Sequence, residues 1–341
     1  MKKQAILYLL IFALLLGGCT APLQSRSKYT ATFLNLFDTV TTVVGMADSE
    51  EAFTSQAQSV HDELLVYHQL FDIYNDYDGI NNLKTVNDHA GISPVAVDPI
   101  IIGLLVSCRE YYDLTDGRVN VTMGSVLRLW HEARNAGIND PANACLPDPE
   151  ALEEAAKHCG WDTVVIDEAA GTVFITDPEQ LLDVGAVAKG WASQRVAENA
   201  PSGLLISVGG NVCATGPKNE EGSPWGVGIT DPEGGPEYLH VLNIPMGSVV
   251  TSGDYQRYYT VEGMRYHHII DPDTLYPSAY WCSVTIVCDD SGLADALSTA
   301  LFLLPQAEGQ ALLDQCGAQA MWVDTEGNFY YSTGFRDYIR T

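Results

Sequence analysis

The sequence predicts an α+β fold, in which one domain combines mixed or antiparallel sheets with flanking helices. Strand-like and helix-like segments do not alternate strictly, as they would in a doubly wound parallel sheet. Runs of strands instead follow one another in the second half, and two helices come after them. No convincing linker divides the chain after residue 30. We therefore expect residues 31–341 to form a single domain.

Most of the predicted helices lie before residue 200. Ser49-Glu50-Glu51 supplies a capping hydroxyl and acidic residues for the start of a helix over 49–71. Asp98-Pro99 opens a second helix to about residue 114, and Gly160 ends a helix that begins at Pro149. Further predicted elements are a β-branched, strand-like run over 29–46, helices over 122–131 and 186–199, a polar loop over 135–149, and a hairpin of 163–167 with 172–176.

Strands dominate after residue 200. They are predicted over 204–208, 225–230, 239–244, 248–252, 255–261, 264–270 and 283–287. Two helices, near 293–304 and 306–316, precede a closing hairpin of 320–323 with 329–331, whose turn contains Glu326-Gly327.

The N-terminus has the pattern of a bacterial lipoprotein signal. Lys2 and Lys3 precede an apolar stretch over 5–16, which is too short to span a bilayer. It ends in Gly17-Gly18-Cys19, which resembles a lipobox. We expect residues 1–18 to be a signal peptide, Cys19 to carry lipid, and residues 19–30 to include a flexible spacer. The alternative is an uncleaved anchor or an ordinary secretory signal. All three interpretations place the remaining chain outside the cytoplasm, and the lipoprotein interpretation anchors it to the cell membrane by lipid.

The composition restricts the classes of ligand. The chain has 44 acidic and 17 basic residues and a formal net charge of −27. Nucleic acids and anionic membrane surfaces are therefore poor partners, and a phosphate ligand would need a divalent cation to offset the repulsion. Seven cysteines remain besides Cys19, without CxxC or Cys/His ligand spacing. Zinc is thus not expected, and we interpret most cysteines as buried apolar residues, with one disulfide left open.

Two oxygen-bearing side chains interrupt the apolar run near the C-terminus. Asp295 and Thr299 are four residues apart, so they share one face of a helix. A carboxylate among Ala and Leu is costly to bury without compensation, and Mg²⁺ prefers oxygen ligands. The pair therefore indicates half of a metal site. The alternative is that Asp295 caps a helix that begins near Leu293 while Thr299 bonds back to a carbonyl.

Two further segments carry candidate chemistry. The turn from Asp183 to Lys189 leads into a helix N-terminus, which can present backbone groups to a phosphate or a cation, or can simply start the helix. Residues 251–255 and 267–272 place polar groups at the ends of two neighbouring strands, so both clusters can meet at one end of a sheet. His268 is a candidate base there, or else a donor of a structural hydrogen bond.

Taken in order, these segments resemble the FAD:protein FMN transferase family of the ApbE type. The sequence has no GxGxxG, P-loop or Gly-x-Ser-x-Gly motif. The resemblance extends over about residues 30 to 335, and its last three motifs are specific. The matching segments are 37–39, 71–74, 116–117, 121–130, 183–190, Ser207-Val208-Gly209-Gly210, Thr251-Ser252-Gly253-Asp254, His268-Ile269-Ile270-Asp271-Pro272 and Ala294-Asp295-Ala296-Leu297-Ser298-Thr299.

The resemblance implies an ApbE-like domain that binds FAD with Mg²⁺ at the pyrophosphate. Asp295 and Thr299 match side-chain ligands of the metal, with the backbone carbonyl of Ala186 as a third ligand. His268 matches a histidine implicated in catalysis. Residues at the FAD-contacting positions of the family are Phe37, Tyr74, Arg118, Val119, Asn120, Asp183, Lys189 and Ile270.

The implied reaction is Mg²⁺-dependent transfer of FMN from FAD to a Ser or Thr hydroxyl of another protein, with release of AMP. His268 is assigned as the base, with Asp254 or Asp271 as helpers, and Lys189 as the partner of a phosphate oxygen. The expected acceptor is an extracytoplasmic subunit of a redox complex or a secreted flavoprotein, recognised through a short Asp-Gly-x-Ser/Thr-like motif.

Some positions depart from the family pattern. Phe37-Asp38 replaces Met-Gly, and Gly117-Arg118-Val119-Asn120 replaces Gly-Ala-Phe-Asp. These changes alter the flavin wall more than the metal site. Two other functions therefore stay open: an FAD-binding lipoprotein without transferase activity, and a Mg²⁺-dependent FAD pyrophosphatase in which water replaces the acceptor hydroxyl.

Overall fold

A computed structural model describes residues 26–341 of the chain. The predicted signal peptide, the lipidation of Cys19 and most of the spacer lie outside the described residues. The first strand, β1 (Ser27–Leu36), begins within the range 19–30 that we predicted as spacer. It does so because Ser27 already pairs with Ala47 of the next strand. Among the described helices, none has both the length and the apolar character needed to cross a membrane.

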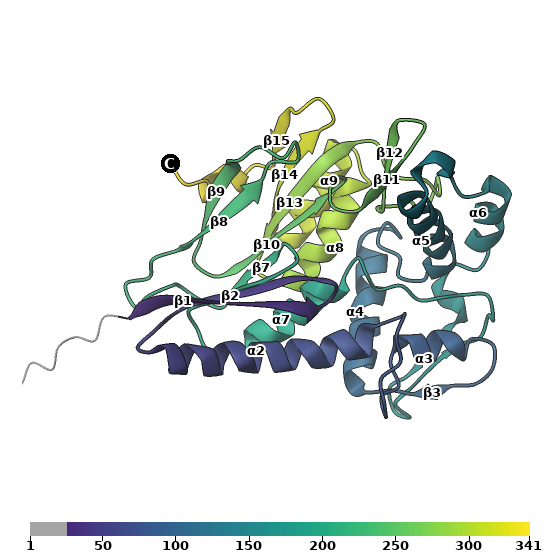
Figure 1. The fold of residues 1–341 in the computed structure, drawn as a ribbon, viewed down its shortest axis with the longest axis horizontal. Coiled ribbons are helices and arrows are strands. Elements are labelled where there is room, and N and C mark those ends of the chain that lie inside the picture. The colour runs from purple at the N-terminus through teal and green to yellow at the C-terminus, as the bar shows by residue number, and fades with distance from the viewer. Residues whose placement is uncertain (1–25) are drawn as a thin grey trace, which may run out of the picture.

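The central element is an eight-stranded antiparallel sheet (Figure 1). Its strand order is β1-β2-β6-β7-β10-β13-β14-β15, and the bounds after β1 are β2 (Thr39–Ala47), β6 (Leu204–Val208), β7 (Asn211–Ala214), β10 (Gly247–Gly253), β13 (Trp281–Cys288), β14 (Gln319–Asp324) and β15 (Phe329–Tyr331). The predicted α+β class with antiparallel pairing is confirmed.

The N-terminal strand differs from its prediction. Residues 29–46 do not form one strand, because Phe37 and Asp38 turn the chain back with φ of 51° at both residues. Two consecutive positive φ angles match the twist of antiparallel strands, as in a two-residue hairpin turn. Gly209 and Gly210 make a turn of the same kind between β6 and β7, and the Gly209 N–H donates to the Val40 carbonyl at 3.1 Å. The two turns therefore lie side by side.

Three small sheets complete the strands. They are β3-β5-β4, β8-β9 and β11-β12. Their bounds are β3 (Val95–Ala96), β4 (Val164–Asp167), β5 (Thr172–Ile175), β8 (Trp225–Thr230), β9 (Tyr238–Ile244), β11 (Tyr258–Val261) and β12 (Met264–His267). The predicted strand over 264–270 is three residues shorter, because the chain after His267 enters a loop in which the Asp271 N–H donates to Tyr276.

The helices are α2 (Glu50–Phe71), α3 (Leu83–Asp88), α4 (Pro99–Leu114), α5 (Gly124–Asn139), α6 (Pro149–Ala156), α7 (Ala188–Asn199), α8 (Ser291–Phe302) and α9 (Gln306–Cys316), with short 3₁₀ turns at Pro141–Asn143, Trp161–Thr163 and Phe335–Tyr338. Helix α5 is eight residues longer at its C-terminal end than predicted, so part of the expected polar loop is helical. Helix α3 was missed. It is short, and an Asn82 capping box starts it.

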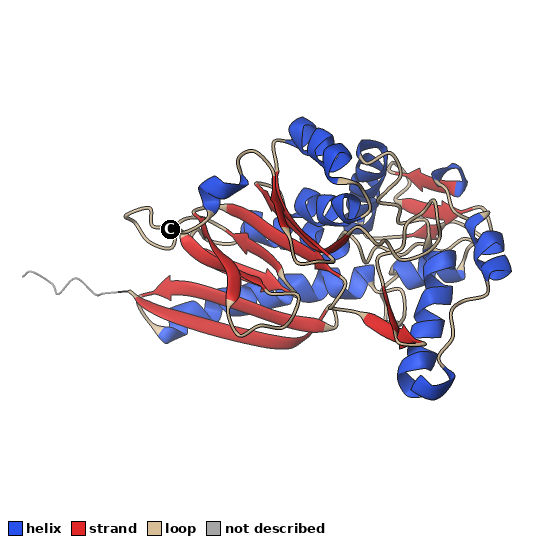
Figure 2. Cartoon of the chain, turned by 90° about the horizontal axis from the view of Figure 1, so that it is seen from above, coloured by secondary structure: helices blue, strands red, loops and turns tan. Residues whose placement is uncertain are grey.

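The main sheet is covered on both faces. Side chains alternate along each strand, so Val250 faces the large core formed with α2, α7 and α8, while Val249 faces a second core beneath β8 and β9. Helix α8 lies in the large core with ten of its residues buried. Strands are concentrated in the half of the molecule that holds the C-terminus, and most helices lie in the other half (Figure 2). The seven described cysteines are free thiols.

Candidate functional site

Asp295 is the most deeply buried charged group of the predicted site. It lies in the second turn of α8 and is 4% exposed. The Gly190 N–H donates to its Oδ2 at 2.8 Å, and the Lys189 Nζ is 3.9 Å from the same oxygen. Burial raises the pKa of Asp295, while Lys189, the Gly190 N–H and the Asn211 side chain act in the opposite direction. A carboxylate can accept about four hydrogen bonds, so these contacts leave it with unused acceptor capacity.

The alternative structural role for this pair is wrong. Asp290, not Asp295, caps α8, because its Oδ1 accepts the Leu293 N–H at 2.8 Å. Thr299 lies one turn beyond Asp295, and within residues 26–341 its hydroxyl has no hydrogen-bond partner. It therefore does not bond back to a carbonyl. Neither side chain has the helix-terminating or helix-bonding role that would explain it without a ligand.

Close packing of α7 on α8 brings the Asp183-to-Lys189 turn to Asp295. A Cβ atom at Gly190 would lie 2.4 Å from both the Asp295 Cβ and the Ser291 carbonyl oxygen, so only glycine fits at this crossing. Because the Gly190 N–H is used by Asp295, it does not bond to the carbonyl four residues earlier, which is that of Ala186. In the described part of the chain no backbone N–H donates to that carbonyl.

These residues fit the magnesium ion that the sequence implied. The described residues contain no group of three or more His, Cys, Asp or Glu side chains that could hold a metal. The candidate ligands here are one carboxylate, the Thr299 hydroxyl and the Ala186 carbonyl. All are oxygens, and the last two have no hydrogen-bond partner among residues 26–341. Mg²⁺ is typically held by one or two carboxylates, waters and substrate phosphates, so such a sparse set of oxygens suits it.

A chain of hydroxyls joins the end of β10 to α8. The Ser252 and Ser298 Oγ atoms are 2.8 Å apart, and the Ser298 hydroxyl donates to the Asp295 carbonyl at 2.8 Å. Asp254 follows β10, and burial raises its pKa, while His267 and Arg265 act in the opposite direction. Tyr258 of β11 pairs with His267 of β12, and His267 acts on Asp254, so the segments 251–255 and 267–272 lie close together, as predicted.

The two adjacent histidines have different roles. The His267 Nε2–H donates to the Ser278 carbonyl at 2.7 Å, and its Nδ1 accepts the Ile269 N–H at 3.2 Å, so both ring nitrogens are used within the fold. The His268 Nδ1 is 3.2 Å from the Arg257 carbonyl, which makes Nδ1 the protonated nitrogen and leaves the Nε2 lone pair available. Burial, followed by the charges of Arg257, His267 and Lys189, lowers the pKa of His268 to about 3. A neutral imidazole that can accept a proton therefore lies within the electrostatic influence of Lys189.

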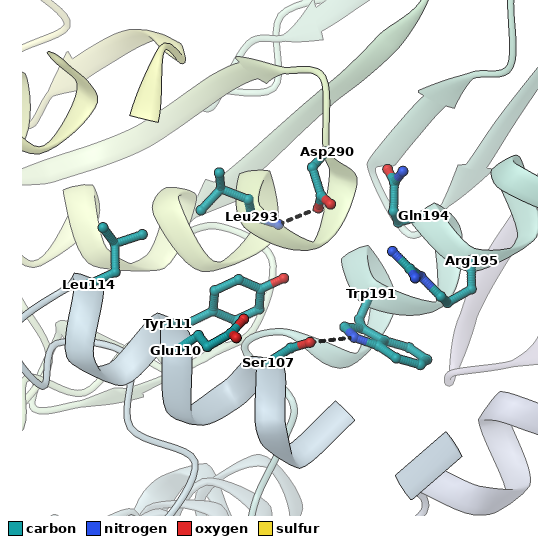
Figure 3. A pocket seen from close by; sticks show the side chains of 9 residues that line it. All are labelled: Ser107, Glu110, Tyr111, Leu114, Trp191, Gln194, Arg195, Asp290 and Leu293. Atoms are coloured by element: carbon teal, nitrogen blue, oxygen red, sulfur yellow. Dashed lines mark hydrogen bonds between the residues drawn. The ribbon is translucent and has the colours of Figure 1, made fainter. Parts of the chain in front are cut away.

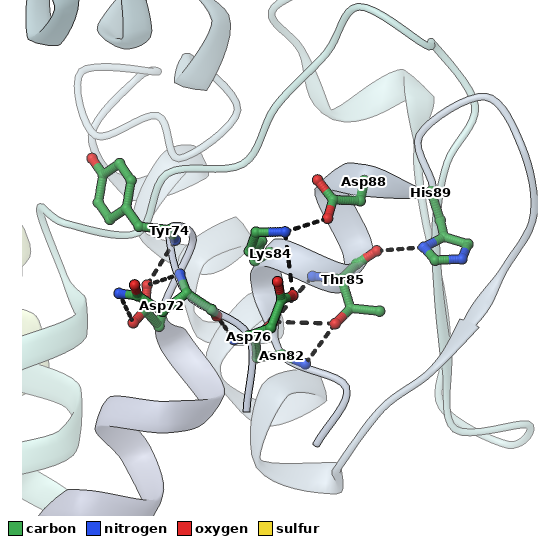
Figure 4. A network of polar contacts seen from close by, with 9 residues as sticks. Asp72, Tyr74, Asp76, Asn82, Lys84, Thr85, Asp88 and His89 are labelled. Atoms are coloured by element: carbon green, nitrogen blue, oxygen red, sulfur yellow. Dashed lines mark hydrogen bonds and ion pairs between the residues drawn. The ribbon is translucent and has the colours of Figure 1, made fainter. Parts of the chain in front are cut away.

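The loop after α2 holds Tyr74 beside this region. The Asp72 Oδ1 accepts the N–H groups of Tyr74 at 2.7 Å and Asn75 at 3.1 Å, which orders the loop (Figure 4). The Tyr74 side chain is 60% exposed, and its hydroxyl is 2.9 Å from the His131 Nδ1. Partial burial and the charge of Asp183 raise the pKa of Tyr74 to about 12. Tyr74 and Asp183 therefore face the same space, with the ring free to stack on a ligand.

The other residues predicted to contact FAD are buried or bonded to neighbouring residues of the protein. Arg118 forms ion pairs with Asp271 at 3.3 Å and Asp273 at 2.6 Å, so its charge is neutralised within the protein. The Asn120 Oδ1 accepts the Thr122 N–H at 3.0 Å. Val119 and Ile270 are buried at 1% and 6% exposure. The Phe37 N–H donates to the His68 Nδ1 at 3.2 Å. For these residues the FAD contact stays a prediction.

Sequence reasoning missed three basic residues beside the site. His131 and Arg134 lie on α5 and line a small cleft together with His267 and His268. Arg257 lies in the loop before β11, and its charge adds to the effect of burial in lowering the pKa values of His131 and His268. The signal that could have revealed the first two was their spacing of three residues, which places both on one face of α5.

A separate cavity of about 460 Å³ lies between α4, α7 and the start of α8 (Figure 3). Trp191 lines it, and the Trp191 Nε1–H donates to the Ser107 Oγ at 3.1 Å. None of the predicted site residues lines this cavity.

Comparison with known proteins agrees with this geometry. The model of the ApbE family matches residues 37–322. A relative named FAD:protein FMN transferase from Treponema pallidum (strain Nichols) is 34% identical over 277 residues, which are 76% of this chain and 75% of the relative. A relative of the same name from Klebsiella pneumoniae (strain 342) is 32% identical over 267 residues, which are 75% of this chain and 80% of the relative.

Solved structures share the fold. The crystal structure of the ApbE protein from Thermotoga maritima MSB8 has a TM-score of 0.81 and 29% identity, and the match covers 92% of this chain and 100% of that one. The flavin transferase ApbE from Vibrio cholerae has a TM-score of 0.74 at 22% identity, covering 92% and 99% of the two chains, and it supports the fold alone. Because the family match spans most of the chain and includes the site described above, this protein belongs to the ApbE family.

Proposed function

We propose that the protein transfers FMN from FAD to a Ser or Thr hydroxyl of an acceptor protein outside the cytoplasm, in a Mg²⁺-dependent reaction that releases AMP. One observation carries the proposal. The buried Asp295 lies 3.9 Å from Lys189, and its Oδ2 accepts the Gly190 N–H. The Ala186 carbonyl, four residues before Gly190, and the Thr299 hydroxyl, one helical turn after Asp295, have no hydrogen-bond partner within residues 26–341. A divalent cation and a phosphate ligand would complete this arrangement. The FAD:protein FMN transferase name of the relatives from Treponema pallidum and Klebsiella pneumoniae supports the same reaction.

The residues of the chain divide the reaction between them. The acceptor oxygen attacks the FMN-side phosphorus of FAD and its proton passes to the His268 Nε2, while the bond from that phosphorus to the bridging oxygen breaks and AMP leaves with this oxygen. Lys189 binds a pyrophosphate oxygen and offsets the negative charge that develops. Asp295, Thr299 and the Ala186 carbonyl would hold Mg²⁺, which when bound stabilises charge on the same oxygens. The product is a phosphoester-linked FMN on the acceptor.

The remaining site residues bind the flavin nucleotide. The exposed ring of Tyr74 is available for stacking, and Asp183 lies close enough to influence it. Since Arg118 is already paired with Asp271 and Asp273, we assign its effect to the shape of the loop around Val119 rather than to charge on the ligand.

We also propose that Cys19 anchors the protein to the outer side of the cell membrane by lipid. The lipobox-like Gly17-Gly18-Cys19 supports this location. Its acceptors would then be extracytoplasmic redox subunits or secreted flavoproteins. Cys19→Ser should shift the protein from the membrane fraction to the soluble fraction, and an unchanged membrane fraction would contradict lipidation at this residue.

The function is tested with the full-length protein, FAD, Mg²⁺ and a candidate acceptor. Flavin fluorescence of the acceptor in a denaturing gel measures transfer, and chromatography measures AMP and free FMN. We expect a fluorescent acceptor and an equal amount of AMP. Free FMN and AMP without a labelled acceptor would show a pyrophosphatase instead, and unchanged bound FAD would show storage. His268→Ala serves as the matched variant and should lose transfer while it still binds FAD.

A further inference from the structure

Helix α3 is joined to the turn that precedes α7 by a single side chain. The Asn87 Nδ2–H donates to the Leu182 carbonyl at 2.9 Å, and the Leu182 N–H donates to the Asn87 Oδ1 at 2.8 Å. The amide thus exchanges two hydrogen bonds with one residue, as the neighbouring residue of an antiparallel strand would, although 95 positions of sequence separate them. Leu182 is fully buried and directly precedes the turn from Asp183 to Lys189.

The start of this turn has few other hydrogen bonds to hold it. The Asp183 N–H donates to the Val121 carbonyl at 2.8 Å. Among the residues that the structure describes, no further hydrogen bond joins the backbone of residues 182–186 to a segment outside the turn and α7. Asn87 therefore makes two of the three hydrogen bonds that fix the part of the turn from which the Ala186 carbonyl is presented.

The opposite end of α3 holds the loop that carries Tyr74 (Figure 4). The Asn82 Nδ2–H donates to the Asn75 carbonyl at 2.8 Å. The Lys84 N–H donates to the Asp72 carbonyl at 3.0 Å. Because a helix of six residues is only about 9 Å long and is stiff along its axis, α3 sets the separation between the Tyr74 loop and the turn before α7.

We propose that Asn87 is a positioning residue for FAD and Mg²⁺, which acts through the turn before α7 and not by contact with either ligand. The proposal rests on the proposed function, because that function assigns the Ala186 carbonyl to the metal and Lys189 to a phosphate oxygen. An asparagine suits this role because its side chain supplies a donor and an acceptor side by side. Without this pairing the turn is free to shift, and a displacement of about 1 Å can lower a reaction rate by about 100-fold.

Two substitutions test this role. Asn87→Ala removes both hydrogen bonds. Asn87→Asp keeps the size of the side chain and an acceptor for the Leu182 N–H, but it loses the donor and places a carboxylate against the Leu182 carbonyl. Asn81→Ala is the matched control, because Asn81 lies just before α3 and its Nδ2–H donates at 2.8 Å to the Ala96 carbonyl in β3 rather than to the turn.

The full-length protein is studied at a temperature at which a thermal melt shows every variant to be folded. FAD binding is measured by fluorescence titration at several Mg²⁺ concentrations, and kcat and KM are measured for FAD and for the acceptor. We expect both Asn87 variants to raise the dissociation constant of FAD in the presence of Mg²⁺ by about 10-fold, the usual effect of losing one or two hydrogen bonds. They should also raise the Mg²⁺ concentration for half-maximal binding, while KM for the acceptor stays unchanged. Asn81→Ala should keep the wild-type value of each quantity.

The outcomes separate positioning from folding and from the proposed function. If the Asn87 variants lower Tm but bind FAD with the wild-type affinity and Mg²⁺ dependence, Asn87 serves the fold alone and the proposal is overturned. An equal loss of FAD binding in Asn81→Ala would overturn it as well. A wild-type protein that binds FAD with Mg²⁺ but labels no acceptor would contradict the proposed transfer, and the binding titrations of the Asn87 variants would still decide the positioning role. A wild-type protein that binds no FAD would overturn both proposals.

Discussion

Replacing Asp295 by asparagine separates the two roles of this buried side chain. Asparagine keeps an oxygen that can accept the hydrogen bond from the Gly190 N–H, which in the wild-type protein is 2.8 Å long. It removes the negative charge that a metal ion requires. In Mg²⁺-free buffer we expect Asp295→Asn to unfold at or slightly above the temperature of the wild-type protein, because no ionised carboxylate has to be desolvated. Lys189, whose Nζ is 3.9 Å from the carboxylate, is partly exposed and remains hydrated.

The difference in stability between the two proteins should appear when Mg²⁺ is added. A ligand present at about 100 times its dissociation constant stabilises the protein that binds it by about 2.7 kcal/mol. For a domain of this size, that corresponds to a rise of about 4 °C in Tm. The wild-type protein should show this rise, and Asp295→Asn should show none and should also lose Mg²⁺-dependent transfer.

The pH dependence gives the same prediction an independent check. Burial raises the pKa of Asp295 in the metal-free protein. Its contribution to stability is therefore fully present below the ordinary Asp pKa of about 3.9 and is lost as the pH rises through the raised value. Mg²⁺ binding requires the ionised form, so the Mg²⁺-induced rise in Tm should shrink as the pH falls through that same raised value.

The assay is a thermal melt followed by fluorescence, with Mg²⁺ titrated at several pH values. Asp290→Ala is the matched control, because it removes the cap of the same helix and should cost about 1 kcal/mol while the response to Mg²⁺ is unchanged. If Asp295→Asn kept the Mg²⁺-induced rise in Tm or its transfer activity, the assignment of Asp295 as a metal ligand would be wrong.

Three further predictions follow from single contacts. Because the pKa of His268 is lowered to about 3, its imidazole NMR signals should stay constant from pH 8 to pH 5 in the substrate-free protein. The stability that the neutral imidazole contributes is present above the unfolded-state pKa of about 6.5 and should be lost as the pH falls toward the folded-state value. An NMR transition near pH 6.5 would contradict this prediction. Gly190→Ala should lower the free energy of unfolding, measured in urea, by about 3 kcal/mol, because the new Cβ would lie 2.4 Å from two atoms of α8. Gly103→Ala within α4 is the control: its Cβ would be 3.5 Å from the nearest atom, so this change should be neutral or stabilising by up to about 1 kcal/mol. Equal effects of the two changes would contradict the tight crossing. Tyr74→Ala should weaken FAD binding by about 10-fold in a fluorescence titration, because the ring is lost. Tyr74→Phe loses only the hydrogen bond to His131 and should bind FAD nearly as well as the wild-type protein. Similar losses in both variants would show that the hydroxyl, not the ring, contacts FAD.

Local patterns in the sequence were sufficient for most elements of the fold. Hairpins, helix starts and the α+β class depend on residues close together in the chain, so the hairpin of β4 with β5 and the starts of α2 and α4 were predicted within a residue or two. The predicted strand over 29–46 failed because its turn uses Phe37-Asp38 rather than glycine or asparagine. The antiparallel pairing of β1 with β2 shows that the chain reverses there, and β2 then pairs with β6 on its other side.

The sequence by itself determined that Asp295 and Thr299 share a helical face, because helical spacing is a local property. What surrounds that face depended on the crossing of α7 over α8, which brings Gly190 to Asp295 across 105 positions of sequence. The same limit explains the choice between two adjacent histidines. Only the carbonyls of Ser278 and Arg257 decide that His267 is used within the fold and that His268 keeps a free nitrogen. Contacts between distant segments determine desolvation and the direction of each hydrogen bond, and these set the chemistry of the site.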